Sequence, residues 1–150
     1  MEMTGEQLVP LAQQETWNAL NDPAVLKDCI PGCESIDKAS DNVYNVVLVA
    51  RIGPVSAQFK GKMTVTDADP PRGYTLIFEG QGGAAGFAKG QATVALTPQN
   101  GSTQLAYTAK ATIGGKLAQV GSRLVDGVAK KLAGDFFTAF NERVSGKSAA

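Results

Sequence analysis

The chain has 150 residues, 14 basic and 14 acidic side chains, and no histidine. This length is typical of one domain, so we expect a single domain over residues 1–150. The balanced charge argues against nucleic acid as a partner. Without histidine, Ser-His-Asp and Cys-His nucleophiles and imidazole-ligated metals are excluded, and we expect no metal and no cofactor.

No pattern for export or for crossing a membrane is visible in the chain. Its start, MEMTGEQLVP, lacks the basic and apolar regions of a signal peptide, and no apolar run approaches the ~20 residues of a transmembrane helix. These observations predict a cytoplasmic protein. In a reducing compartment, Cys29 and Cys33 are expected to be free, buried or partly buried thiols.

The N-terminal part predicts one strand and two short helices. Residues 2–9 alternate weakly, as in a short strand, and residues 10–22 have helical periodicity. Asp22 and Pro23 are a typical N-cap and first helical residue. They predict a second helix that ends at Pro31-Gly32.

Between residues 34 and 113 the periodicity changes to two, which indicates strands joined by short turns. The predicted strands cover residues 34–39, 43–52, 55–68, 74–81, 87–97 and 102–113. The clearest alternation puts Val55, Ala57, Phe59, Gly61, Met63 and Val65 on one face, and the next strand does the same with Tyr74, Leu76, Phe78 and Gly80. We expect an antiparallel meander wrapped around a final helix, which is an α+β architecture.

Residues 114–140 form the longest helical pattern, although Gly121, Gly127 and Gly134 each cost a helix interior roughly 1 kcal/mol relative to alanine. A continuous helical wheel puts Gly127, Gly134 and Phe137 on the wet side and Gly121 in the middle of the apolar arc. That arc contains Leu117, Leu124, Val125, Val128, Leu132 and Ala139, extended by Phe136 and Phe140. Residues 145–150 are predicted to fray.

Small residues face one another across the predicted sheet and helix. Gly121 would oppose Ala57, Gly61 and Gly80, which leaves either closely approaching layers or a cavity. The residues alone do not decide between these two. Successive turns of a meander alternate ends, so one rim would collect Gly53, Pro54, Gly83, Gly86, Phe87, Gly114 and Gly115, either as a ligand entrance or as simple tight turns.

Other constellations do not indicate catalytic chemistry. The stretch GQGGAAGFAKG lacks the phosphate-loop spacing and joins two predicted strands. No inward pair of carboxylates can be identified, so the pattern shows no residues that would carry out acid–base hydrolysis.

Three stretches, DPAVLKDCIPGCESI, GPVSAQFKGKMTV and KLAQVGSRLVDGVAKKLAGDFFTAF, closely resemble the G-subunit family of carbon monoxide dehydrogenase. This family belongs to the START-like, helix-grip (SRPBCC) superfamily, and the resemblance covers residues 1–145. It implies a curved antiparallel sheet that grips a long C-terminal helix around an apolar cavity. It also implies association with molybdenum hydroxylases of the carbon monoxide dehydrogenase type, without catalysis.

The resemblance further implies that the protein recruits that enzyme to the membrane or handles its lipophilic electron acceptor, a quinone. Some members of the family continue into a linker and an apolar tail, whereas this chain stops at SGKSAA. We therefore expect at most transient contact with the inner face of the cytoplasmic membrane.

Pattern and resemblance together predict a non-catalytic module that holds a lipophilic small molecule, such as a quinone or an isoprenoid lipid, for such a dehydrogenase. Tyr107 would offer its hydroxyl to a ligand oxygen. A Gly121→Leu substitution would fill the cavity. The predicted lining consists of Phe59, Gly61, Met63, Phe78, Tyr107, Gly121, Leu124, Val125 and Val128.

Two alternatives stay open. An assembly or membrane-recruitment factor would act through its exterior, by the basic face of the final helix or by Phe137. An enzyme of the cyclase or hydrolase type on the same fold would need inward Asp or Glu residues beside the cavity.

Overall fold

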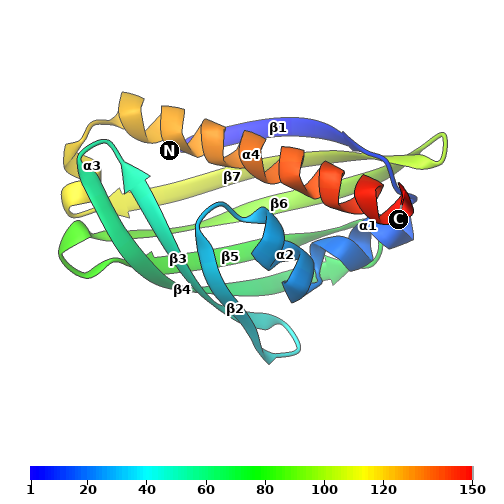
Figure 1. Cartoon of the computed structure of the whole chain (residues 1–150), viewed down its shortest axis with the longest axis horizontal. Coiled ribbons are helices and arrows are strands. Elements are labelled where there is room, and N and C mark those ends of the chain that lie inside the picture. The colour runs from blue at the N-terminus through cyan, green and yellow to red at the C-terminus, as the bar shows by residue number, and fades with distance from the viewer. Residues whose placement is uncertain (150) are drawn as a thin grey trace.

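The fold is known from a computed structural model that describes residues 1–149, with side chains described up to residue 145. A seven-stranded antiparallel sheet has the order β1-β7-β6-β5-β4-β3-β2. Figure 1 shows this curved sheet with the long helix α4 crossing one of its faces, on the same side as α1 and α2. The elements are β1 (Glu2–Val9), α1 (Gln13–Leu20), α2 (Pro23–Cys29), β2 (Cys33–Ser40), β3 (Val43–Ile52), β4 (Val55–Asp69), β5 (Gly73–Gln81), η1 (Gly83–Ala85), β6 (Phe87–Gln99), β7 (Ser102–Gly114), α3 (Lys116–Gln119) and α4 (Ser122–Ala149).

The predicted α+β architecture is confirmed, with its meander and its helices after the first strand. Consecutive strands β2 to β7 pair with one another, and β1 closes the order by pairing with β7, from Glu2↔Lys110 to Val9↔Thr103. The start of α2 forms as its sequence predicts, because the Asp22 side chain accepts a hydrogen bond from the Ala24 amide at 2.9 Å.

The predicted final helix is wrong in one respect, because it is interrupted. The short helix α3 ends at Gln119, and α4 begins at Ser122. Gly121 lies between them with φ +97°, a left-handed conformation that glycine adopts without steric cost. This glycine therefore ends one helix rather than weakening the interior of another. Fraying was expected over residues 145–150; residues 145–149 continue as helical backbone, and residue 150 lies outside the described residues.

The buried face of α4 is rotated away from the predicted one. Phe137, expected on the wet side, is only 9% exposed, whereas Leu124 and Leu132, expected inside, are 40% and 38% exposed. The helical wheel was centred wrongly because it carried Leu117 of α3 across the break at Gly121. The aromatic residues of the second half of α4 set its true orientation, and Gly127 and Gly134 lie on the exposed side, as predicted.

The core consists of three clusters of buried side chains. The largest surrounds Phe137, Phe140 and Val144 of α4 and includes Val9, Leu20, Val25, Cys29, Leu96 and Leu105. A second, under β2 to β5, contains Ile36, Tyr44, Val46, Val65 and Tyr74. The third, at the other end of the sheet, contains only Phe59, Ala85 and Leu117. The second and third clusters enclose the space that concerns function.

Candidate functional site

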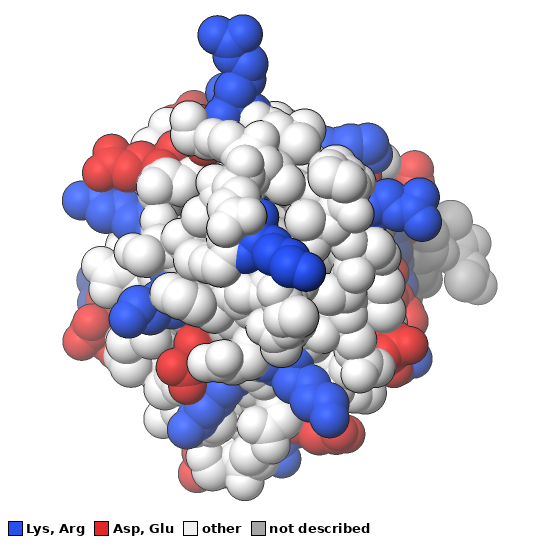
Figure 2. All heavy atoms as spheres, turned by 90° about the vertical axis from the view of Figure 1, so that its left-hand side faces the viewer, with Lys and Arg blue, Asp and Glu red and all other residues white. Residues whose placement is uncertain are grey.

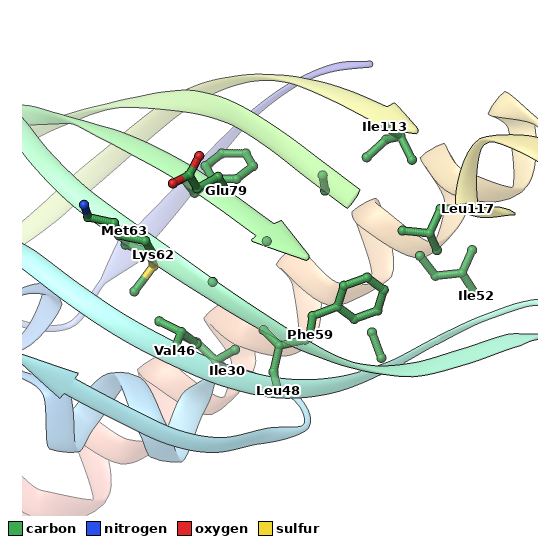
Figure 3. Close-up of a pocket in the computed structure, with 15 residues that line it drawn as sticks. Ile30, Val46, Leu48, Ile52, Phe59, Lys62, Met63, Glu79, Ile113 and Leu117 are labelled. Carbon is green, nitrogen blue, oxygen red and sulfur yellow. The ribbon is translucent and has the colours of Figure 1, made fainter. Parts of the chain in front are cut away.

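A cavity of about 320 Å³ lies between the second and third clusters and is partly open to solvent. Figure 3 shows its wall, to which β3, β4, β5, the turn after α2, and α3 all contribute. The lining residues are Ile30, Val46, Leu48, Ala50, Ile52, Phe59, Gly61, Lys62, Met63, Phe78, Glu79, Gly80, Ala88, Ile113 and Leu117. No described side chain of α4 is among them.

The wall of the cavity is apolar because of strand alternation. Phe59, Gly61 and Met63 follow every second position of β4, so they share the inner face. Lys62 and Glu79 are the two lining residues with charged side chains, and both are exposed. Each stands between two inward residues of its strand, so its side chain projects to the opposite face. The inner surface therefore offers a ligand almost nothing but hydrocarbon.

Two glycines face each other at the cavity wall, and one of them widens the cavity. Gly61 of β4 pairs with Gly80 of β5, and Met63 pairs with Phe78 beside them. A Cβ added at Gly80 would meet no other atom within 4 Å, whereas one added at Gly61 would come within 2.6 Å of the Glu79 carbonyl oxygen. Gly80 thus keeps open a space that a side chain would enter freely.

The third cluster closes one end of the cavity. Phe59, Ala85 of η1 and Leu117 of α3 pack together there, and all three are buried. The main chain just after η1 and the main chain just before α3 lie against each other at Gly86 and Gly115. A Cβ atom added to Gly115 would come within 2.5 Å of the Gly86 Cα atom. Only two glycines allow this approach of main chain to main chain.

The seven residues predicted as a rim lie in the turns and strand ends around this closed end. Gly53 and Pro54 form the β3–β4 turn, and the other five belong to η1 and its flanks, or to the end of β7 and the residue after it. Phe87 opens β6 and pairs with Gly114. Figure 1 shows the β3–β4 turn, the β5–β6 connection and the end of β7 on the same side of the molecule.

Of the nine residues predicted to line the cavity, Phe59, Gly61, Met63 and Phe78 do so. The other five do not. Tyr107 stacks on Phe137 instead, with ring centroids 5.5 Å apart. Gly121 and Leu124 are exposed, and Val125 and Val128 lie on α4 away from the cavity. A Gly121→Leu substitution would therefore strain the backbone at φ +97° and would leave the cavity unfilled.

Sequence reasoning missed the contribution of β3 and of two connections. Val46, Leu48, Ala50 and Ile52 alternate along β3 and line the cavity, a signal that periodicity alone could have supplied. Ile113 continues the alternation of β7 and could have been found in the same way. Ile30 and Leu117 carry no such signal, because their positions depend on how α2 and α3 pack in three dimensions.

The neighbourhood of the cavity contains weakly acidic groups that stay neutral. Burial raises the pKa of the Tyr74 hydroxyl, whose ring meets Trp17 edge-on at 5.3 Å. Burial likewise raises the pKa of Tyr44, whose hydroxyl donates to the Asn21 carbonyl at 3.1 Å. The side chains described, up to residue 145, contain no group of three that is suited to holding a metal ion.

None of the helices described is long and apolar enough to span a lipid bilayer.

The comparisons with known proteins agree with this architecture. The model of the CoxG family, described as the G subunit of carbon monoxide dehydrogenase, matches residues 5–145. A conserved protein from Geobacillus kaustophilus is 35% identical and superposes with a TM-score of 0.91, over 97% of this chain and 96% of that one. Comparison with curated protein sequences gives no match.

Two more distant structures share the fold. A START superfamily protein from Mycobacterium smegmatis is 13% identical, with a TM-score of 0.73 over 97% of both chains. The ZhuI aromatase/cyclase from Streptomyces sp. R1128 is 12% identical, with a TM-score of 0.70 over 97% of this chain and 93% of that one. At these identities the likeness concerns the fold alone, which is START-like.

Proposed function

Because this chain belongs to the CoxG family of carbon monoxide dehydrogenase, we propose that it is a non-catalytic module that holds a lipophilic small molecule for a molybdenum-containing dehydrogenase. The ligand is of the quinone or isoprenoid class. The apolar cavity carries this proposal.

The size and the chemistry of the cavity support such a ligand. Ligand pockets commonly measure ~300–1,000 Å³, and this one measures about 320 Å³. An apolar molecule gains roughly 25 cal/mol for each Å² that it removes from water. The wall offers few hydrogen-bonding groups, so it favours a hydrocarbon body over a charged or sugar-like one. A quinone ring or a short isoprenoid segment fits this description.

The same wall argues against a catalytic role. General acid–base catalysis needs a titratable side chain within hydrogen-bonding distance of the reacting atoms. The only lining carboxylate and ammonium belong to Glu79 and Lys62, which are exposed on the other face of the sheet. This lining therefore favours a binding module over the enzyme alternative, which would need an inward acid or base.

A Gly80→Leu substitution tests the cavity as the ligand site. The new side chain enters open space without a clash, so the protein should stay folded while the binding volume shrinks. We expect the affinity for menadione, a small quinone, to fall about tenfold or more in equilibrium dialysis, as a ~1.4 kcal/mol loss requires. Gly134→Leu is the matched control, because this glycine also meets no atom within 4 Å but lies on the outside of α4.

Equal affinity of wild type and a folded Gly80→Leu variant would remove the cavity from consideration. Native mass spectrometry of the protein purified with host lipids supplies a second measurement. We expect a bound quinone or isoprenoid in the wild type, and its loss in Gly80→Leu but not in Gly134→Leu.

A further inference from the structure

Helix α4 begins with an apolar hollow on its outer side, and none of the residues that form it lines the cavity. Val120, Gly121, Leu124, Gly127 and Val128 form the hollow, and Arg123 and Lys131 flank it. We call these seven residues the α4 hollow. Leu124 is 40% exposed, so a large part of this apolar side chain faces solvent in the hollow.

The α4 hollow has a regular helical origin. Residues four apart lie on one side of a helix, so Leu124 and Val128 form an apolar row. Arg123, Gly127 and Lys131 form a parallel row beside it. Gly127 thus leaves a gap between two cations, next to two aliphatic side chains.

Nothing inside the protein explains the glycine at position 127. A Cβ there would meet no atom within 4 Å, and the residue is exposed. Alanine at this position would stabilise the helix by roughly 1 kcal/mol. An external partner that comes close to the helix would account for a glycine that internal packing does not require.

The charge near the hollow is mainly positive, with the exposed Asp126 next to Gly127 as the acidic exception. Segments 51–60, 80–89 and 113–125 contain Arg51, Lys60, Lys89, Lys116 and Arg123, and no aspartate or glutamate. Since the whole chain is neutral, its remainder is acidic. Among the described side chains, Arg51, Lys60, Lys116 and Arg123 form no ion pair, whereas Lys131 pairs with Asp135 at 2.8 Å. Figure 2 looks at this end and shows a largely uncharged face with lysines and arginines across it and acidic groups mostly toward its rim.

We propose that the α4 hollow is the docking surface for an acidic amphipathic segment of a partner protein. A carboxylate of that segment lies over Gly127 between Arg123 and Lys131, while its apolar side chains cover Leu124 and Val128. The identification of this partner as the dehydrogenase rests on the proposed function. An apolar centre within a polar rim is the usual anatomy of a protein interface.

The shape of the surface favours a protein partner over a lipid bilayer. Membrane-binding surfaces present apolar side chains that protrude into the headgroup region. Here the apolar residues line a depression, and the neighbouring turns carry Gly53, Pro54, Gly83 and Gly115 at their tips. A protruding side chain of a protein fills a depression, whereas the flat surface of a bilayer does not.

The docking surface adjoins the closed end of the cavity. A Cβ on Gly53 would come within 2.7 Å of a methyl carbon of Leu124, so the hollow meets the β3–β4 turn directly. A partner on the α4 hollow therefore sits next to the cluster of Phe59, Ala85 and Leu117. This position brings the partner close to whatever the cavity holds.

Two substitutions test the proposal with the purified carbon monoxide dehydrogenase-type enzyme of the same organism as the probe. Gly127→Leu fills the gap between the cations, and Arg123→Glu reverses one of them. We expect each to weaken binding about tenfold or more in biolayer interferometry, as for the loss of an interface hot spot. Rising ionic strength should weaken wild-type binding and affect Arg123→Glu less.

The controls separate this surface from general effects and from the ligand site. Thr93→Leu adds apolar bulk on an exposed strand position, and Lys38→Glu reverses a charge outside the basic segments. Both should bind the enzyme as wild type does. Gly80→Leu should also bind the enzyme normally, while Gly127→Leu should keep its affinity for menadione.

Several results would overturn the proposal. Unchanged binding of folded Gly127→Leu, or no binding by the wild type, would show that the hollow is not the docking surface. Wild-type binding to phosphatidylglycerol vesicles that both substitutions abolish, with enzyme binding unaffected, would assign the hollow to lipid. Self-association in sedimentation velocity that Gly127→Leu abolishes would assign it to a second copy. Failure of the wild type to bind menadione, with its docking to the enzyme intact, would instead overturn the proposed ligand function.

Discussion

The two ends of the molecule are packed in different ways. At one end, Phe140, Val9 and Leu105 are at most 1% exposed, and the buried hydroxyl of Thr103 donates to the Leu11 carbonyl at 2.7 Å. At the other end, Phe59, Ala85 and Leu117 form a small cluster beside a cavity of about 320 Å³. The same sheet therefore supports a filled core and an incompletely filled one.

This difference suggests that one end of the sheet stabilises the fold and the other keeps a space for a ligand. The filled end contributes most of the apolar burial that stabilises the fold, since each buried aromatic side chain removes a large area from water. The cavity end gives up part of that burial and keeps a space instead. Regions with few buried contacts are also the ones that open most readily, which suits the entry and exit of a ligand.

The largest effect is expected at the centre of the filled end. Phe140 is 0% exposed, and it stacks on Phe136 with centroids 5.9 Å apart. Phe140→Ala should lower the free energy of unfolding by about 3–5 kcal/mol, because it removes a large side chain from a close-packed site. Urea denaturation followed by circular dichroism measures this change. If Phe140→Ala lowered the free energy of unfolding less than a substitution at the cavity end does, the filled end would not be the more tightly packed one.

A smaller effect is expected from Leu117 at the closed end of the cavity. This side chain is 3% exposed, but one of its sides faces empty space. Leu117→Ala should therefore cost about 2 kcal/mol, the low end of the range for a buried leucine. The same denaturation experiment applies, with Leu105→Ala as the filled-end counterpart that should cost more.

Replacing Gly134 should stabilise the protein without changing the packing at either end. It is an exposed residue of α4, and a Cβ there meets no atom within 4 Å. Gly134→Ala should raise the free energy of unfolding by about 0.4–1 kcal/mol through helix propensity and a less flexible unfolded chain. Thermal unfolding measures it. A decrease would mean that α4 is not a regular helix at this point.

The two cysteines probe the boundary between the clusters. Burial raises the pKa of both thiols, and it outweighs the opposing effect of Arg143 at Cys29 and of Lys27 at Cys33. Since the thiolate is the reactive form, labelling by a disulfide reagent should be slow at neutral pH and should accelerate as the pH rises above the usual thiol range. Cys33, which is half-buried, should react before Cys29, which is 3% exposed. The reverse order would place an opening at the filled end.

The strands were predictable because their period is short and their partners are local. Alternation along residues 55–68 identified Phe59, Gly61 and Met63 as inward residues, and the following strand identified Phe78. All four line the cavity. Tyr107 illustrates the limit of this reasoning, because its stacking partner Phe137 comes from a helix whose position on the sheet no alternation predicts.

The final helix was less predictable because one glycine interrupts it and so changes which of its residues face the sheet. A helical wheel assumes an unbroken helix, and Gly121 at φ +97° breaks it. The apolar residues of the pattern also cover two different sides of α4. Only packing against the sheet decides that Phe137 is buried while Leu124 stays exposed. Sequence periodicity does not contain that choice.

The pairing of the first strand with the last sets when the domain is able to form. Glu2 pairs with Lys110 and Val9 with Thr103, so β1 has no strand neighbour until β7, more than 90 residues later in the sequence, has been synthesised. Contacts between residues so distant in sequence require a large loss of chain entropy before they stabilise anything, and they slow folding. The N-terminal strand should therefore wait, unpaired, during translation. Final assembly of the sheet should be a late step that follows the emergence of β7 from the ribosome.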